Sequence, residues 1–72
     1  MAKMKPPVSE WAAELRDLRI KAGLTQGDLA IVLGLASSTV YRAERGVIRD
    51  ESVRERFDKW IARVRRAQQE AA

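Results

Sequence analysis

The chain has 72 residues, with 14 Lys or Arg against 10 Asp or Glu, and therefore a formal net charge of +4. A chain of this length forms one small domain at most and buries only about 60% of its unfolded surface, so its core is marginal and a partner would help to stabilise it. The absence of Cys and His excludes disulfides, the commonest metal ligands and the usual catalytic base. We expect no metal, no cofactor and no enzymatic activity.

No apolar run approaches the roughly 20 residues that span a bilayer, and the basic start of the chain leads into a charged segment rather than an apolar one. The sequence therefore predicts a cytoplasmic protein, associated with the nucleoid if it binds DNA, with no membrane partner. Residues 1–8 are interpreted as a disordered N-terminal arm, because Pro6 and Pro7 cannot start a hydrogen-bonded ladder.

The hydrophobic pattern of the remaining chain predicts helices and no strands. Ser9 offers an N-cap for a first helix, and Gly23 ends that helix at a position that favours a left-handed residue. The apolar positions of this helix follow one another at spacings of four, three and four, which places them on one helical face: Trp11, Leu15, Leu18 and Ala22.

Two short helices follow. Thr25 and Asp28 have the spacing of a capping box, and the helix that they begin ends at Gly34. A second short helix fits between Ser37 and Arg45, after a three-residue turn. The apolar positions are Leu29, Ala30, Val32 and Leu33 in the first of these helices, and Val40 and Ala43 in the second.

Residues 47–51 are expected to form a loop, after which Ser52 caps a last helix. No helix breaker follows, so this helix can run for about 19 residues, roughly 28 Å. The predicted fold class is all-α: a small four-helix domain over residues 9–66, with a helix-turn-helix at about 26–45 and an extended C-terminal helix that ends, or becomes a tail, within 67–72. The apolar positions of the last helix are Val53, Phe57, Trp60, Ile61 and Val64.

Two short helices joined by a three-residue turn that contains Gly are typical of the helix-turn-helix motif. Ala30 permits a close helix crossing, Gly34 permits a positive φ in the turn, and Val40 is the apolar plug of the second helix. Residues 15–46, LRDLRIKAGLTQGDLAIVLGLASSTVYRAERG, resemble the phage-repressor (Xre/Cro-type) helix-turn-helix family, whose members include phage repressors, plasmid regulators and antitoxins. The resemblance extends to about Ile61, and its most specific blocks are Gly23-Leu24-Thr25-Gln26, Leu29-Ala30, Gly34-Leu35 and Glu44-Arg45-Gly46.

The resemblance implies that the helix between Ser37 and Arg45 lies in the major groove of DNA. Its base contacts would come from four side chains that match outward-facing positions of the family: Ser37, Ser38, Tyr41 and Arg42. Arg42 would be the main reader, because its guanidinium matches O6 and N7 of guanine in a bidentate geometry. Tyr41 would pack on a thymine methyl or bind a phosphate. Alternatively, the two serines only cap the helix.

The resemblance also implies contacts to the DNA backbone, which position a protein without specifying a sequence. Gln26 would bind a phosphate at the N-terminus of its helix, or else be an ordinary exposed residue. Thr39, Arg45 and Arg49 would add further phosphate contacts, although the two arginines could equally be solvated surface charges.

Two further roles are implied. Arg19 and Glu44 match a partly buried ion pair between the first and third helices, which would fix the third helix. Relatives bind DNA as two-fold dimers, and the candidate interface here is the far half of the last helix. Alternatively, both tryptophans of the chain complete a thin core. The candidate dimer-interface residues are Trp60, Val64 and Ala67.

The sequence departs from the family pattern at four points. Ala36 stands where Ser or Thr usually caps the third helix, and Gly27 weakens the second helix. Ala43 replaces a larger apolar residue, so that Phe57 or Trp60 must fill the space beside it. A long fourth helix takes the place of the usual fifth.

The leading hypothesis is a sequence-specific transcriptional regulator, a dimeric repressor or autoregulator that binds an inverted-repeat operator in double-stranded DNA. Residues 42–66 hold nine basic and five acidic residues and so carry the whole net charge of +4, which favours nucleic-acid binding. The alternative is an antitoxin or adaptor whose C-terminal helix binds a small protein partner. RNA binding is disfavoured, because the third helix offers few aromatic side chains for stacking on bases.

Overall fold

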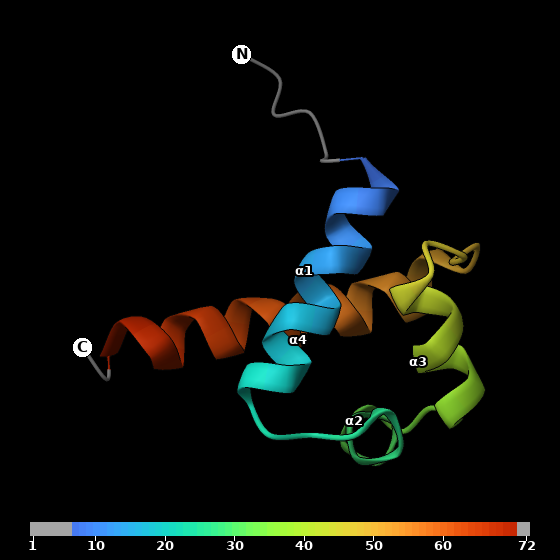
Figure 1. Cartoon of the computed structure of the whole chain (residues 1–72). Helices are drawn as coiled ribbons and strands as arrows, with labels where there is room; N and C mark the ends of the chain where they lie inside the picture. The colour runs from blue at the N-terminus through green and yellow to red at the C-terminus, as the bar shows by residue number, and fades with distance from the viewer. Residues whose placement is uncertain (1–6, 71–72) are drawn as a thin grey trace.

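The computed structural model describes residues 7–70, and four helices occupy most of that range. They are α1 (Val8–Lys21), α2 (Gln26–Leu33), α3 (Ser37–Glu44) and α4 (Glu51–Glu70) (Figure 1). No strand occurs among these described residues, and the all-α, four-helix prediction is confirmed. Most of the predicted N-terminal arm lies outside the described residues, and its last residue, Val8, already belongs to α1.

α4 is the longest helix and packs against α1 and α2, while α3 packs mainly on α2 and α1. α1 crosses α4, while α2 and α3 lie together on one side of this crossing (Figure 1). The C-terminal end of α4 extends to the side of the molecule opposite α3. With 20 residues, α4 is about 30 Å long, which matches the 31 Å width of the molecule.

The turn between α2 and α3 depends on Gly34. Its φ of 68° lies in the left-handed region, where glycine has no Cβ to impose a steric cost. The amide of Leu35 donates to the carbonyl of Ala30 at 2.8 Å. The amide of Gly34 donates to the carbonyl of Ile31 at 3.2 Å, and the two bonds together form a Schellman ending. The chain thus changes direction within three residues and brings α3 across α2 (Figure 1).

Side chains define the starts of α2 and α4. The predicted capping box is confirmed, since Thr25 and Asp28 exchange two hydrogen bonds of 3.0 Å between side chain and backbone. The predicted cap at Ser52 is wrong. The Asp50 carboxylate accepts from the amide and the hydroxyl of Ser52, at 2.9 and 2.7 Å, and the helix begins at Glu51. A carboxylate also interacts favourably with the positive end of the helix dipole, which a serine hydroxyl does not.

The predicted N-cap at Ser9 is also wrong. α1 begins one residue earlier, at Val8, so that Ser9 lies inside its first turn. Pro7 occupies the N-cap position without a side-chain hydrogen bond, and its carbonyl accepts from the amide of Trp11 at 3.1 Å. Proline has no backbone N–H, and it is tolerated there because an N–H at the start of a helix would have no carbonyl partner within the helix.

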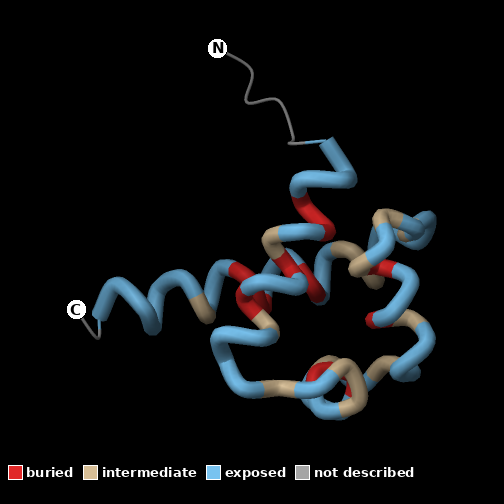
Figure 2. The backbone as a smooth tube through the Cα atoms, viewed as in Figure 1, coloured by how far each residue is buried: buried red, intermediate tan, exposed pale blue. Residues whose placement is uncertain are grey.

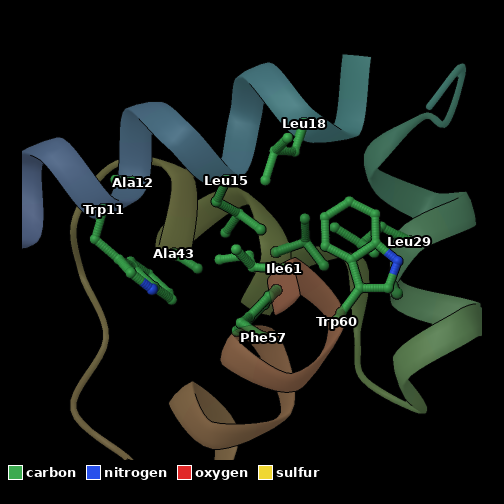
Figure 3. Close-up of a cluster of buried hydrophobic side chains, with 11 residues drawn as sticks. Trp11, Ala12, Leu15, Leu18, Leu29, Ala43, Phe57, Trp60 and Ile61 are labelled. Carbon is green, nitrogen blue, oxygen red and sulfur yellow. The ribbon is translucent and has the colours of Figure 1, made fainter. Parts of the chain in front are cut away.

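The core takes one side of each helix (Figure 2). Leu15, Leu29, Val40 and Phe57 come from four different helices and are fully buried. Trp11 packs edge-on against Phe57, with ring centroids 5.8 Å apart and planes at 87° (Figure 3). The remaining buried apolar residues are Ala12, Leu18, Ala30, Ala43, Trp60 and Ile61.

Several apolar residues in and next to α1 and α2 lie outside this core. Ala22 was expected on the buried face of α1 but is exposed, because the helix ends there before completing another turn. In α2, Ile31 and Val32 are 81% and 55% exposed, since Leu29 and Ala30 already fill the narrow side that faces the core. Ala43 shares the core cluster with Phe57 and Trp60, the residues expected to fill the space beside it.

Acid should weaken the starts of α2 and α4. The hydrogen bond from the Thr25 amide holds the pKa of Asp28 below its ordinary value of 3.8, and the hydroxyl of Ser52 does the same for Asp50. A carboxyl with a lowered pKa in the folded state contributes stability above its unfolded pKa and loses it as the pH falls through the folded pKa. We therefore expect the melting temperature, followed by circular dichroism, to fall below pH 3.8 and to fall less steeply in Asp28→Asn.

Asp17→Asn is the matched control for this measurement, because Asp17 makes only an exposed ion pair with Lys21 on the surface of α1. Its acid transition should follow that of the unmodified chain. Equal acid slopes in the unmodified chain and Asp28→Asn would contradict the contribution of the capping box.

Candidate nucleic-acid interface

One side of α3 is buried and the other faces solvent. Val40 and Ala43 point into the core and are fully buried. The helical period of 3.6 residues turns the neighbouring positions outward. Five side chains are exposed there, four of them predicted to contact bases and one predicted to contact phosphate: Ser37, Ser38, Tyr41, Arg42 and Arg45. α3 therefore presents a polar surface about two turns long that ends in two arginines.

The two serines at the start of α3 do not cap it. Ala36 stands at the N-cap, as the sequence indicated, and no side-chain hydrogen bond caps the helix. The alternative that Ser37 and Ser38 serve only as caps is therefore wrong. Both hydroxyls are exposed at the positive end of the helix dipole, where they can donate to or accept from a ligand.

Tyr41 and Arg45 hold each other on the outer face of α3. Arg45 Nη1 donates to the Tyr41 hydroxyl oxygen at 3.1 Å, and its guanidinium carbon lies 5.5 Å from the centre of the Tyr41 ring. Such cation–π contacts add a fraction of a kcal/mol to about 1 kcal/mol at exposed sites. The contact orders both side chains before any ligand arrives, and the hydroxyl proton of Tyr41 remains able to donate.

Arg42 and Arg49 border a hollow of about 400 Å³ beside α3. The guanidinium groups of Arg42 and Arg49 make no hydrogen bond or ion pair with any other described residue. A guanidinium without a partner can bind oxygen and nitrogen acceptors, such as those of a phosphate or of a base edge. Sequence reasoning missed this hollow, although two adjacent apolar residues in the loop after α3 were a signal for it. The rest of its lining is Thr39, Val47, Ile48, Asp50 and Val53.

Gln26 is the first residue of α2 and is half-buried. Its amide Nε2 donates to Glu44 Oε1 at 3.3 Å, so the side chain is held against the end of α3. The capping box occupies the amide of Asp28 but leaves the first amides of α2 without side-chain partners. The predicted phosphate residue thus lies beside a helix N-terminus, in the position that the resemblance implies.

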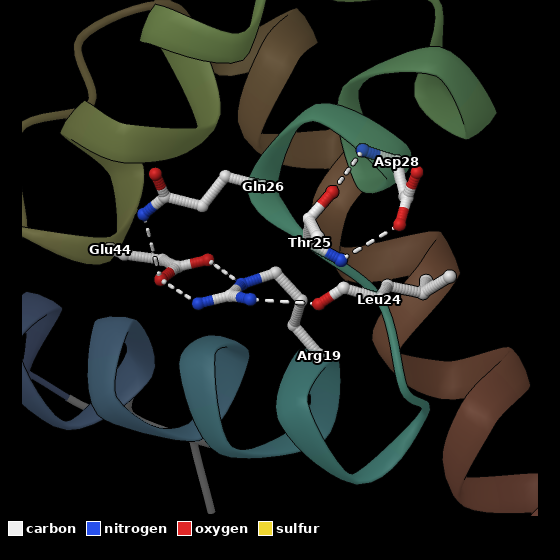
Figure 4. Close-up of polar contacts among 6 residues, drawn as sticks. All are labelled: Arg19, Leu24, Thr25, Gln26, Asp28 and Glu44. Carbon is white, nitrogen blue, oxygen red and sulfur yellow. Dashed lines mark hydrogen bonds and ion pairs between the residues drawn. The ribbon is translucent and has the colours of Figure 1, made fainter.

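Arg19 and Glu44 form a bidentate ion pair between α1 and α3 (Figure 4). Arg19 Nε donates to Glu44 Oε2 at 2.6 Å and Nη2 donates to Oε1 at 3.1 Å. Arg19 Nη1 also donates to the carbonyl of Leu24 at 2.8 Å, in the turn between α1 and α2. The side chains of Arg19 and Glu44 are only 12% and 4% exposed. With Gln26, they form a polar cluster that joins three helices at the edge of the core.

The two tryptophans are core residues. Trp11 is 4% exposed, and its indole N–H donates to Asp58 Oδ1 at 2.7 Å. Trp60 is 6% exposed, so its ring offers little area to a second copy of the chain. The other two candidate dimer residues differ from each other, since Val64 is half-buried against the core and Ala67 is exposed.

A family model described as a helix-turn-helix domain matches residues 10–71. The chain belongs to this family. The match spans nearly all of the four helices, and the two short helices α2 and α3 with the Gly34 turn between them form the motif itself. Comparison with curated proteins and with solved structures gives no significant match.

Membership of the helix-turn-helix family indicates a DNA-binding regulator, and domains of this kind are typically not enzymes. None of the described helices is both long and apolar enough to cross a membrane. Within residues 7–70, no cluster of three or more His, Cys, Asp or Glu could hold a metal ion. The surface formed by α3 and the start of α2 is therefore the candidate functional site of this helix-turn-helix domain.

Replacing Arg19 should unfold the domain more easily. Arg19→Ala leaves the Glu44 carboxylate nearly buried and without its charge partner, which costs about 3 kcal/mol in the free energy of unfolding. Lys21→Ala is the matched control, because its ion pair with Asp17 is exposed and contributes about 0.5 kcal/mol or less. Urea unfolding followed by circular dichroism measures both. An Arg19→Ala variant as stable as Lys21→Ala would show that the buried pair does not hold the fold.

Proposed function

We propose that this helix-turn-helix domain is a sequence-specific transcriptional repressor or autoregulator that binds an inverted-repeat operator as a homodimer. The observation that carries the proposal is the outer face of α3, where four exposed side chains stand on a helix whose other side is fixed in the core. A helix of this width fits the major groove of B-DNA. Arg42 is the residue best suited to read a guanine, because no partner among the described residues occupies its guanidinium.

Backbone contacts support the same orientation. Gln26 at the start of α2 and Arg45 and Arg49 after the outer face of α3 would bind phosphates on either side of the groove. Thr39, half-buried in the wall of the hollow beside Arg42, would add a hydroxyl there. These contacts supply affinity that depends on salt, while the base contacts supply discrimination.

Dimerisation supports useful specificity, because one recognition helix reads only a short half-site. The C-terminal turns of α4 extend away from the other helices, and Ala67 is exposed there (Figure 1). A second copy packing on this end of α4 would meet small and apolar residues rather than a fully charged surface.

The decisive experiment is a titration of the protein on the DNA upstream of its own gene, with scrambled competitor, at two salt concentrations. Specific binding should survive the competitor and weaken steeply with salt. Arg42→Ala should lower the preference for the operator over scrambled DNA by about tenfold to hundredfold, which corresponds to the loss of one bidentate base contact.

Arg66→Ala is the matched control for Arg42→Ala, because Arg66 is exposed on the far half of α4 and the charge change is the same. It should leave the preference for the operator unchanged. If both variants weaken binding equally to operator and scrambled DNA, only a general basic surface is at work, and sequence-specific regulation by α3 is excluded.

The dimer has a separate test. Ala67→Asp should shift the sedimentation coefficient to that of a monomer and lower operator affinity, because two carboxylates would meet across the interface. Gln68→Asp is the control, since it adds the same charge one position along the helix, on a different face. A dimer that survives Ala67→Asp would move the interface away from the end of α4.

A further inference from the structure

A groove separates the end of α2 from the middle of α4, and its floor is apolar. We call it the α2–α4 groove, a hollow of about 190 Å³. Its floor is formed by Val32, Leu33 and Trp60. Val32 is 55% exposed, although it lies on a helix that packs into the core. Its neighbour in the sequence, Ile31, is 81% exposed but does not line the groove.

The rim of the α2–α4 groove is entirely basic. Arg56, Lys59 and Arg63 recur at offsets of three and four residues, so that they share one face of α4. Arg56 donates to the carbonyl of Leu33 at 3.1 Å, which holds its guanidinium over the groove. Lys59 lies 3.8 Å from Glu55, and Arg63 has no partner among the described residues. No acidic residue lines the groove to offset these three charges.

Trp60 adds a hydrogen-bond donor to the lining of this groove. Trp60 is 6% exposed, and its indole N–H donates to no other described residue, but the N–H itself reaches solvent, since Arg54 Nε is the one buried side-chain nitrogen or oxygen without a partner among the described residues. An indole N–H that reaches solvent can donate to an acceptor on a ligand. Trp11 shows the usual arrangement, because its indole N–H binds a carboxylate. An acceptor such as a carboxylate in the α2–α4 groove would satisfy Trp60 in the same way.

The residues that flank the described range carry no acidic side chains to match the basic rim. The six residues before the described range carry two lysines and no acidic residue, and the two after it are alanines. Most of the ten acidic residues already bind a partner within the domain, at helix starts or in ion pairs. A second copy of the chain therefore offers little free acidic surface, and the complement must come from another molecule.

The groove is separate from the candidate nucleic-acid interface. Val32 and Leu33 lie at the C-terminal end of α2, whereas Gln26 lies at its N-terminal end. The eight residues of this helix span about 12 Å. The lining of the groove includes neither Gln26 nor any residue of α3, and the inference does not rest on the repressor function.

We propose that the α2–α4 groove binds an acidic, amphipathic helical segment of a partner protein. Apolar side chains of that segment would cover Val32 and Leu33, as in other helix-in-groove complexes. Its carboxylates would bind Arg56, Lys59 and Arg63 and accept from the indole N–H of Trp60. An apolar floor inside a basic rim favours this ligand over a nucleic acid, whose backbone offers charge without apolar anchors.

The test uses three synthetic fluorescein-labelled peptides of about 15 residues, the length at which isolated helices become stable. The first carries Leu at helical spacings of three and four with Glu elsewhere. The second replaces each Glu by Lys, and the third replaces each Leu by Ser. Fluorescence anisotropy at physiological salt should show micromolar binding of the first peptide and at least about tenfold weaker binding of the other two.

Two groove variants and one control then locate the site. Arg63→Glu and Val32→Asp should each weaken binding of the first peptide by about tenfold or more. Arg63→Glu reverses one charge of the rim, and Val32→Asp places a carboxylate in the apolar floor. Arg16→Glu makes the same charge change on the exposed surface of α1, outside the groove, and should leave affinity nearly unchanged. All three positions are exposed, and thermal melting followed by circular dichroism verifies that the variants remain folded.

Three results would overturn the proposal. Equal binding of the Leu-containing and Ser-containing acidic peptides would show attraction by charge alone. An equal loss in Arg16→Glu and Arg63→Glu would show that the whole basic surface is responsible. A loss of DNA binding in Arg63→Glu, with peptide binding unchanged, would assign the groove to nucleic acid. Operator binding by α3 is measured separately, so its failure leaves this test unaffected.

Discussion

The buried ion pair between Arg19 and Glu44 is the constraint on which the arrangement of the helices depends. One guanidinium binds the end of α3 and the turn before α2, and the same carboxylate also accepts from Gln26 at the start of α2. Helices of eight residues are not stable alone in water, so α2 and α3 take their orientation from this cluster and from the core beneath it. The free energy lost when two charges leave water is about as large as the free energy gained from their attraction. We therefore interpret the pair as selecting one arrangement of the helices rather than as adding much net stability.

Much of the fold could be predicted because its signals are local. The capping box of Thr25 and Asp28 and the turn at Gly34 depend on residues a few positions apart, and the periodic apolar residues of α4 identified its buried side. The errors at Ser9 and Ser52 have a physical cause. Several capping residues can compete for one helix start, and a carboxylate at Asp50 outcompetes a hydroxyl two residues later.

Less of the candidate site could be predicted, because its shape depends on contacts between distant elements. Periodicity and the family pattern indicated the outer face of α3, but neither showed that Arg45 stacks on Tyr41 or that the loop after α3 closes a hollow beside Arg42. Val32 is exposed because the buried side of α2 is too narrow to include it, and the hydrophobicity of valine did not indicate this. A groove between two helices likewise exists only once both are placed, so no stretch of the sequence indicates it alone.

The core is completed from both ends of the chain. Trp11 in α1 binds Asp58 and packs against Phe57, both in α4, and the fully buried residues of α2 and α3 share that core. Contacts across such long separations form late, because closing the intervening chain costs entropy first. During synthesis on the ribosome, α2 and α3 therefore leave the exit tunnel before the α4 side chains that complete their core. A chain that ends before Phe57 would lack the α4 side of this core and could not hold the helix-turn-helix, whereas one that ends after Val64 would lose, of the described residues, only exposed ones.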